Sequence, residues 1–192
     1  MKKAFRRTGT ARAMELEAAG IPRTQLARLV ASGQLQKVAR GLYAPAGYQG
    51  SEHGGLVAVA KRAPQVVFCL LTALRLHELT TQSPSEVWIA IGNKEHPPRL
   101  DYPPLRTVRL SAASLRHGIE TMVVDGVPLK VTTPAKTVAD CFKFRNKVGI
   151  DVALEALREA RRERKATADE LWRCATINRV ANVMRPYLEA IL

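Results

Sequence analysis

Residues 11–45 read ARAMELEAAGIPRTQLARLVASGQLQKVARGLYAP, and this stretch decides the fold of the N-terminal region. Residues 11–19 are strong helix formers, and Gly20 follows where a helix commonly ends in a left-handed C-cap. Pro22 suits the first turn of a second helix, in which apolar residues recur at i, i+3 and i+4 from Leu26. Two short helices around a tight glycine turn predict a helix-turn-helix.

A short β-hairpin is predicted directly after the second helix. Val38 and Leu42 favour strand, and Arg40-Gly41 between them supplies a turn in which glycine adopts a positive φ. We therefore expect a winged helix-turn-helix over residues 11–44. Proline and glycine in residues 45–50 mark a linker, which places the domain boundary at residue 48.

The rest of the chain, residues 49–192, is predicted to be a mixed domain that ends in helices. Period-two patterns and the turn signal Asp125-Gly126 predict strands over 66–68, 86–91, 105–110, 118–124 and 127–131. Helical patterns and caps predict helices over 52–62, 69–79, 134–144, 151–164, after the capping box Thr167–Glu170, and over 178–191. The fold class is α+β, with a winged helix-turn-helix at 1–48 and an α+β domain at 49–192.

The charge is strongly basic and is concentrated at the N-terminus. The net charge of the 192 residues is +13. Residues 1–48 hold nine Lys or Arg against two Glu, so a quarter of the chain carries +7. Such an excess favours a polyanionic partner, and nucleic acid is the commonest one. An anionic membrane is disfavoured because no long helix is basic on one face and bulky-apolar on the other.

The candidate DNA contacts lie on the second helix and the wing. In a helix-turn-helix the N-terminal end of the second helix approaches the bases, where Arg can bond guanine and Gln can bond adenine. The wing and the first helix meet the backbone or the minor groove. The predicted contacts are Arg12, Arg23, Thr24, Gln25, Arg28, Lys37 and Arg40.

Three segments in order along the chain resemble AbiEi-type antitoxins of type IV toxin–antitoxin, or abortive-infection, systems. The first is the winged helix, in Gly20–Leu26, Ser32–Leu35 and Val38–Tyr43. The second, Leu71–Leu79, is similar to the family's SAL-x-LHGL helix, with Glu78 in place of the glycine. The third, Val131–Asp140, is similar to its TPERTLVD segment. Only Lys2 to Arg7 stand where relatives have a full first helix.

This resemblance implies a function for the whole chain. It implies a transcriptional repressor of its own operon that binds double-stranded DNA at its promoter. It also implies an antitoxin whose C-terminal domain counteracts a nucleotidyltransferase-fold toxin without a stable complex. The sequence leaves the oligomeric state open between monomer and dimer.

Catalysis receives little support from the residues. The four histidines are dispersed without metal-ligand spacing, and no nucleotide-binding or nucleophile motif is present. We expect no enzyme activity, cofactor or metal, and a cytoplasmic location for a chain with three scattered cysteines. Two alternatives stay open: a nuclease targeted by the winged helix, and a regulator that senses a ligand. The basic segment 158–165 is either a solvated helix face or a second contact with DNA or RNA.

Overall fold

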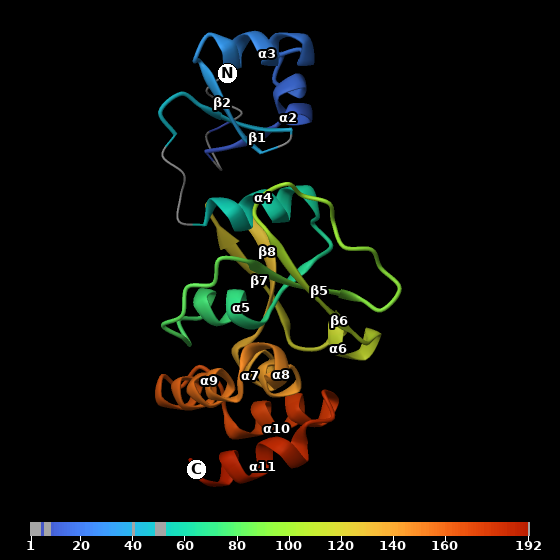
Figure 1. The fold of residues 1–192 in the computed structure, drawn as a ribbon, viewed down its shortest axis with the longest axis vertical. Helices are drawn as coiled ribbons and strands as arrows, with labels where there is room; N and C mark the ends of the chain where they lie inside the picture. Colours follow the sequence, from blue (N-terminus) through green and yellow to red (C-terminus); the bar gives the residue numbers. More distant parts are fainter. Residues whose placement is uncertain (1–4, 6–8, 40, 49–52, 192) are drawn as a thin grey trace. The chain divides into compact units, whose positions relative to one another are not determined.

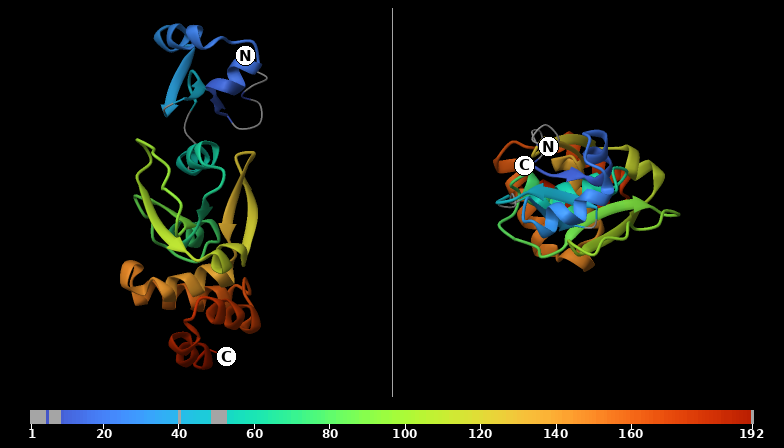
Figure 2. Two further views of the ribbon diagram at one scale, coloured as in Figure 1. Left: turned by 90° about the vertical axis from the view of Figure 1, so that its right-hand side faces the viewer. Right: turned by 90° about the horizontal axis from the view of Figure 1, so that it is seen from above.

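The computed structural model describes residues 5, 9–39, 41–48 and 53–191. Its elements are labelled in Figure 1, and Figure 2 shows the ribbon from two further directions. The chain divides into two compact units. The first unit comprises residues 1–64, 98–104 and 122–129, and the second comprises 65–97, 105–121 and 130–192. A domain boundary at residue 48 stays a prediction.

The helix-turn-helix forms with one change at its start. Strand β1 (Ala11–Arg12) precedes helix α2 (Ala13–Ala18), and helix α3 spans Arg23–Ala31. The prediction that a helix begins at residue 11 is therefore wrong. Ala11 and Arg12 instead pair with Tyr43 and Leu42. Pairing with a strand thirty residues away overrides the local helix propensity of this segment.

The turn between the two helices follows the predicted chemistry. Gly20 adopts a φ of +87°, a conformation that costs glycine nothing. The Ile21 N–H donates to the Leu16 carbonyl at 2.8 Å, which satisfies the end of α2. Pro22 has extended backbone and is the N-cap of α3. Its fixed φ thus directs the chain into the second helix.

The wing is a three-stranded antiparallel sheet in the order β1-β3-β2. Strand β2 (Leu35–Ala39) and strand β3 (Leu42–Pro45) form the predicted hairpin, and Gly41 in its turn has a φ of +73°. A register shift between Lys37 and Ala39 places a bulge in β2. Arg40 lies outside the described residues.

A small core holds the winged helix together. Each of its side chains is less than one-tenth exposed, and they come from the two helices, the turn between them, the sheet and the chain before it. They are Phe5, Ala11, Leu16, Ile21, Leu26 and Leu35. The apolar stripe of α3 faces this core, with Leu29 and Val30 at its margin. The opposite face of α3 is left to the solvent.

The first unit also contains helix α4 (Gly54–Arg62), the loop 98–104 and the tip of the hairpin of strands β7 (Ile119–Val124) and β8 (Val127–Thr132). Helix α4 lies within the predicted segment 52–62, of which residue 52 is outside the described residues. Asp125 and Gly126 have φ values of +49° and +73°, as a type I′ turn requires, so the predicted hairpin turn is confirmed.

A five-stranded mixed sheet in the order β6-β5-β4-β8-β7 runs through the rest of the chain. Strand β4 is antiparallel to β5 and parallel to β8, while β5 is parallel to β6. The strands correspond closely to the predicted segments. They are β4 (Val67–Phe68), β5 (Val87–Gly92), β6 (Leu105–Leu110), β7 (Ile119–Val124) and β8 (Val127–Thr132).

Seven helices complete the second unit among the described residues. Two of them, α6 and α8, are too short to leave a periodic signal and were not predicted. The helices are α5 (Leu70–Leu76), α6 (Ala112–Arg116), α7 (Pro134–Lys143), α8 (Arg145–Val148), α9 (Ile150–Arg162), α10 (Ala168–Ile177) and α11 (Ala181–Glu189). The capping box of Thr167 and Glu170 at the start of α10 is confirmed.

Helix α5 ends three residues before the predicted end at Leu79. Glu78 has a φ of +55°, and the Leu79 N–H donates to the Leu74 carbonyl at 2.8 Å. This is a left-handed C-terminal turn, in which glycine is the favoured residue. A glycine at this position, as in the SAL-x-LHGL pattern, adopts the left-handed conformation without strain. Glu78 adopts the same conformation although it carries a side chain. Leu79 is fully buried as a result.

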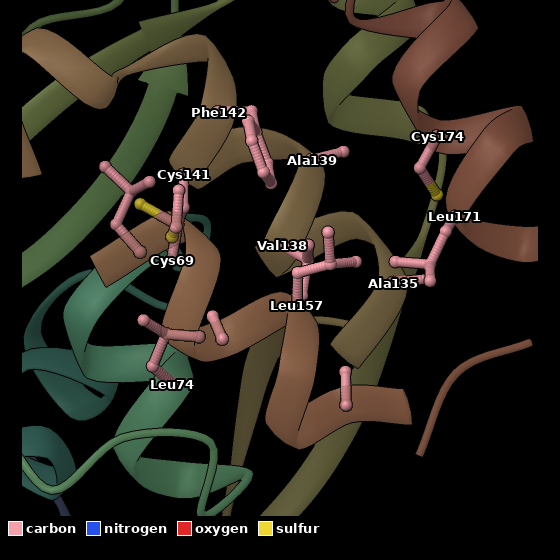
Figure 3. Close-up of a cluster of buried hydrophobic side chains, with 14 of the residues drawn as sticks. Cys69, Leu74, Ala135, Val138, Ala139, Cys141, Phe142, Leu157, Leu171 and Cys174 are labelled. Atoms are coloured by element: carbon pink, nitrogen blue, oxygen red, sulfur yellow. The ribbon is translucent and has the colours of Figure 1, made fainter. Parts of the chain in front are cut away.

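The main core lies in the second unit, between the sheet and the helices that follow it (Figure 3). Helix α7 is central, since Val138, Ala139 and Phe142 are fully buried and the helix packs against α5, α9 and α10. Cys69, Cys141 and Cys174 also belong to this cluster (Figure 3). No helix in the described part of the chain is long and apolar enough to cross a membrane.

Candidate nucleic-acid interface

The outer face of α3 presents four polar side chains. Arg23, Thr24, Gln25 and Arg28 are all exposed, because Leu26 takes the buried position of the same helical turn. Three of them occupy the first turn, and Arg28 lies one turn further along. The structure thus brings four of the predicted contacts together on one helix.

The N-terminus of α3 adds backbone donors to this face. Pro22 makes no side-chain cap, and the Gln25 N–H donates back to the Pro22 carbonyl at 2.9 Å. The amides of Arg23 and Thr24 belong to the first turn, which has no intrahelical acceptors. Together with the helix dipole, such amides favour an anion such as a phosphate.

Arg23 is held by an acidic neighbour that sequence reasoning missed. Its Nε donates to Glu17 Oε2 at 3.0 Å, and the two side chains are 61% and 52% exposed. An exposed pair of this kind contributes roughly 0–1 kcal/mol. A phosphate can therefore displace Glu17 at small cost. Glu17 is six residues from Arg23, across the turn, and sequence spacing does not reveal such a pair.

The wing contributes one described contact candidate. Lys37 is exposed on β2 opposite Tyr43, at the bulge that shifts the register of the hairpin. A bulge twists a strand and redirects its side chains. Lys37 is thus a surface cation on the wing, next to the turn that holds Gly41.

Arg12 is placed differently from the other predicted contacts. It is half-buried where β1 meets α2, and its backbone N–H donates to Glu15 Oε2 at 2.6 Å. Its Nη2 atom is buried and has no hydrogen-bond partner among the residues that the structure describes. The structure therefore separates Arg12 from the exposed set on α3, and its contact with phosphate stays a prediction.

Lys61 at the end of α4 is a basic residue that sequence reasoning did not single out. Its Nζ donates to the Thr10 carbonyl at 2.5 Å and lies 3.9 Å from Glu15 Oε2. Burial lowers the pKa of Lys61, the Glu15 carboxylate raises it, and the Arg12 guanidinium lowers it further. The side chain of Lys61 is buried and that of Arg12 is half-buried, and the two cations lie close enough within the first unit to repel each other.

The basic segment 158–165 makes several contacts within the chain. Arg162 pairs with Glu159 and Glu163, and Lys165 Nζ donates to the His77 carbonyl at 2.6 Å. Through these contacts Arg162 and Lys165 stabilise the end of α9 and the chain that follows it. A second nucleic-acid contact in this segment would depend on the exposed Arg158 and Arg164.

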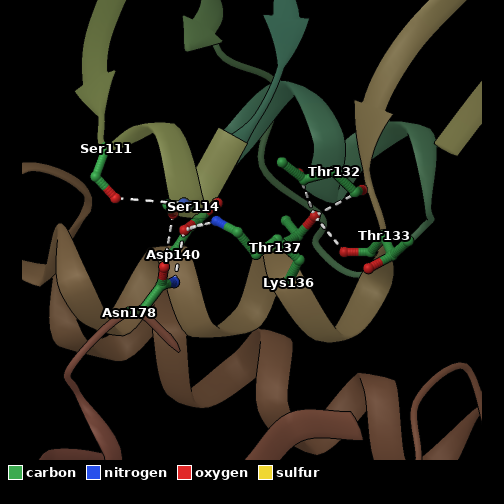
Figure 4. A network of polar contacts seen from close by, with 8 residues as sticks. All are labelled: Ser111, Ser114, Thr132, Thr133, Lys136, Thr137, Asp140 and Asn178. Atoms are coloured by element: carbon green, nitrogen blue, oxygen red, sulfur yellow. Dashed lines mark hydrogen bonds and ion pairs between the residues drawn. The ribbon is translucent and has the colours of Figure 1, made fainter. Parts of the chain in front are cut away.

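The segment that resembles TPERTLVD carries a buried polar network (Figure 4). Lys136 and Asp140, one helical turn apart on α7, form an ion pair and are 0% and 1% exposed. Asn178 donates from Nδ2 to Asp140 Oδ1 at 2.7 Å and accepts from Ser114 Oγ at 2.9 Å. The network joins α7 to α6 and to the chain after α10, so it is a structural feature of the core.

The buried cysteines and His77 of the second unit are not grouped into a metal site. Among the described residues, no three His, Cys, Asp or Glu side chains are arranged to hold a metal ion. Burial raises the pKa of the Cys174 thiol to about 11 and raises that of Cys69 well above its ordinary value. His77 Nε2 lies 2.6 Å from the Thr132 carbonyl oxygen, and burial lowers its pKa.

The comparison with protein families points to the same part of the chain as this surface. Residues 1–46 match a family model described as a transcriptional regulator, AbiEi antitoxin. A search of curated proteins finds no match. The matched residues contain α2, α3 and the wing, which form the winged helix-turn-helix of an α+β protein. The N-terminal region is therefore similar to the AbiEi antitoxin transcriptional regulators, as the sequence resemblance predicts.

Proposed function

We propose that this protein is a DNA-binding repressor and the antitoxin of a type IV toxin–antitoxin system. The observation that carries the proposal is the exposed face of α3, with Arg23, Thr24, Gln25 and Arg28, inside the region that matches the AbiEi family model. A helix with a free N-terminus and base-reading side chains, followed by a basic wing, has the parts of a major-groove reader.

The two classes of contact have separate roles in this proposal. Thr24 and the first-turn amides of α3 meet a phosphate and set the register of the protein on the duplex. Gln25 and Arg28 reach base edges, while Lys37 on the wing meets the neighbouring backbone. Arg23 releases the Glu17 carboxylate and contacts DNA instead. The concentration of positive charge in residues 1–48 supports an affinity that falls steeply with salt.

The binding target proposed is the promoter of the protein's own operon. A mobility-shift titration with that promoter compares wild type with Arg23→Ala/Arg28→Ala, and Arg173→Ala is the matched control because Arg173 is exposed on α10, outside the proposed contacts. If each arginine reads a base, its loss costs about 1–3 kcal/mol, so the double variant binds at least tenfold more weakly. Undiminished binding by the double variant would refute the assignment of α3 as the recognition helix.

A second variant tests the exchange at Arg23. Glu17→Gln removes the carboxylate that pairs with Arg23 in the free protein and also removes one negative charge near the DNA. We expect equal or tighter promoter binding by this variant. Weaker binding would contradict the role given to Glu17.

The antitoxin part of the proposal concerns a nucleotidyltransferase-fold toxin encoded beside the gene. It rests on the resemblance of residues 71–79 and 131–140, in the second unit, to segments of AbiEi-type antitoxins. Co-expression of the neighbouring toxin with wild type or with Arg23→Ala/Arg28→Ala tests it. We expect both forms to restore growth, since the substitutions lie in the DNA-binding region. Continued growth arrest with wild type would refute antitoxin activity while leaving the repressor function standing.

A further inference from the structure

A cavity of about 520 Å³ opens in the first unit beside the proposed DNA-binding surface. Every residue that lines it belongs to that unit. Its walls come from the start of α2, the first residue of α3, the wing turn, the end of α4 and the loop 99–102. Its volume lies within the range of about 300–1,000 Å³ that is usual for small-molecule sites.

The wall of this cavity is rich in cations. Five basic side chains line it: Arg12, Arg23, Lys61, Arg62 and Arg99. Asp101 is the acidic residue of the wall, and Glu15 and Glu17 contact Lys61 and Arg23 from nearby. Even with these three carboxylates the cations are in excess. The cavity therefore favours an anionic ligand.

Two of these cations are built into the fold. Lys61 has an 8% exposed side chain and is held by the Thr10 carbonyl, and Arg12 is half-buried. The Nη2 atom of Arg12 is buried without a hydrogen-bond partner among the described residues, although it carries two N–H donors. An unsatisfied buried donor on a charged group is costly, and an anion in the cavity would satisfy it.

The remaining wall offers a surface for a flat, apolar group. Tyr102 is 67% exposed and Met14 is 66% exposed, and both line the cavity. Exposed large apolar side chains inside a charged cavity are typical of a binding site, in which a ring stacks while polar groups fix the orientation. The ligand chemistry that fits both features is a phosphate joined to an aromatic base.

We propose that this cavity binds a nucleoside phosphate, with its phosphates on Arg12 and Arg99 and its base against Tyr102. Lys61, which is held by the Thr10 carbonyl, adds positive charge to the cavity. Arg23 belongs both to the cavity wall and to the proposed DNA contacts. A ligand that draws Arg23 toward its phosphates competes with DNA for that side chain, so occupancy of the cavity weakens promoter binding. This coupling rests on the proposed function, whereas ligand binding itself does not.

Isothermal titration of the full chain without DNA tests the site, with ATP, inorganic tripolyphosphate and adenosine as probes. We expect ATP to bind more tightly than either of the other probes. Arg12→Met and Arg99→Met each lose about 10- to 100-fold in ATP affinity, as expected for one charge-assisted contact. Arg99 is exposed on a loop, so Arg99→Met retains the fold, and Arg158→Met is the matched control. Circular dichroism checks folding.

The outcomes separate this inference from the proposed function. No binding of ATP by wild type, or equal affinity in wild type and Arg99→Met, would overturn the site. Tripolyphosphate binding as tightly as ATP would overturn the assignment of a nucleoside. If Tyr102→Ala loses ATP affinity but binds the promoter normally without ligand, the two surfaces are distinct and the inference stands. Wild-type protein that binds the promoter but shows no affinity for ATP would overturn the cavity as a ligand site and leave the repressor function standing.

Discussion

The buried ion pair of Lys136 and Asp140 makes a sharp prediction about the stability of the second unit. Both side chains are almost completely inaccessible, and Asp140 also accepts a hydrogen bond from Asn178. Replacing Lys136 by Met leaves a carboxylate in the core with one neutral donor. Replacing Asp140 by Asn leaves an ammonium there without a counter-charge. Each single change should lower the free energy of unfolding by about 3–5 kcal/mol.

The double variant Lys136→Met/Asp140→Asn removes both charges together. In the wild type, Asn178 Nδ2 donates to Asp140 Oδ1 at 2.7 Å. The side-chain carbonyl oxygen introduced by Asp140→Asn can accept the same hydrogen bond. We therefore expect the double variant to lose only about 1–2 kcal/mol, the scale of one altered hydrogen bond. The sum of the single losses is several kcal/mol larger, so the cycle should show strong coupling between the two positions.

Urea unfolding followed by tryptophan fluorescence and circular dichroism measures these energies through linear extrapolation. The matched control is the ion pair of Arg162 and Glu159 on α9, in which the arginine is 69% exposed. Arg162→Ala should cost less than about 1 kcal/mol, because solvent screens an exposed pair. The reasoning is refuted if Lys136→Met costs as little as Arg162→Ala, or if the double variant loses the sum of the two single losses.

Three further predictions follow from individual residues. Lys37→Ala on the wing should lower the slope of log affinity against log salt by about 1, measured by promoter titrations at several salt concentrations, because one phosphate contact is lost. Glu78→Gly should raise the free energy of unfolding by at most about 1 kcal/mol. Relief of the left-handed conformation is worth roughly 1–2 kcal/mol, which exceeds the cost of the added flexibility of glycine in the unfolded chain. A loss of stability in urea unfolding would contradict this. Burial is the chief reason that His77 has a pKa below its ordinary value of 6.5 in the folded protein. As the pH falls, His77 is therefore protonated in the unfolded chain before it is protonated in the folded protein. The free energy of unfolding should therefore decrease below about pH 6.5 in wild type and decrease less in His77→Gln, as urea titrations at pH 7.5 and 5.5 would measure.

Much of the architecture was predictable because its signals are local. The apolar stripe of α3 and the glycine turns at Gly20 and Gly41 each depend on a few neighbouring residues. Strand β1 was missed because Ala11 and Arg12 carry helix propensity and take their strand conformation from Tyr43 and Leu42. The short helices α6 and α8 were missed because four or five residues show no period.

In the candidate site, too, features that depend on neighbouring residues were predictable and features that depend on distant residues were not. The exposure of Arg23, Thr24, Gln25 and Arg28 follows from their position opposite Leu26, which the helical period defines. Arg12 lies close enough to Lys61, 49 residues further along the chain, to lower its pKa, and Lys61 in turn donates to the Thr10 carbonyl. No spacing rule connects these residues. The cavity therefore could not be predicted from the sequence, although the basic residues that line it were counted in the net charge.

The two C-terminal segments that resemble AbiEi antitoxins have a different meaning once their burial is known. Leu74 and Leu79 of the first segment, and Lys136, Thr137 and Asp140 of the second, are buried in the core of the second unit. A buried residue cannot contact a toxin, so the buried residues of these segments stabilise the fold of the domain. Under the proposed function, the residues that contact a toxin are exposed ones, and the first segment itself carries two exposed side chains, Arg75 and Glu78. Antitoxin specificity is therefore to be sought by substitution of exposed side chains, with the buried Lys136–Asp140 pair left intact.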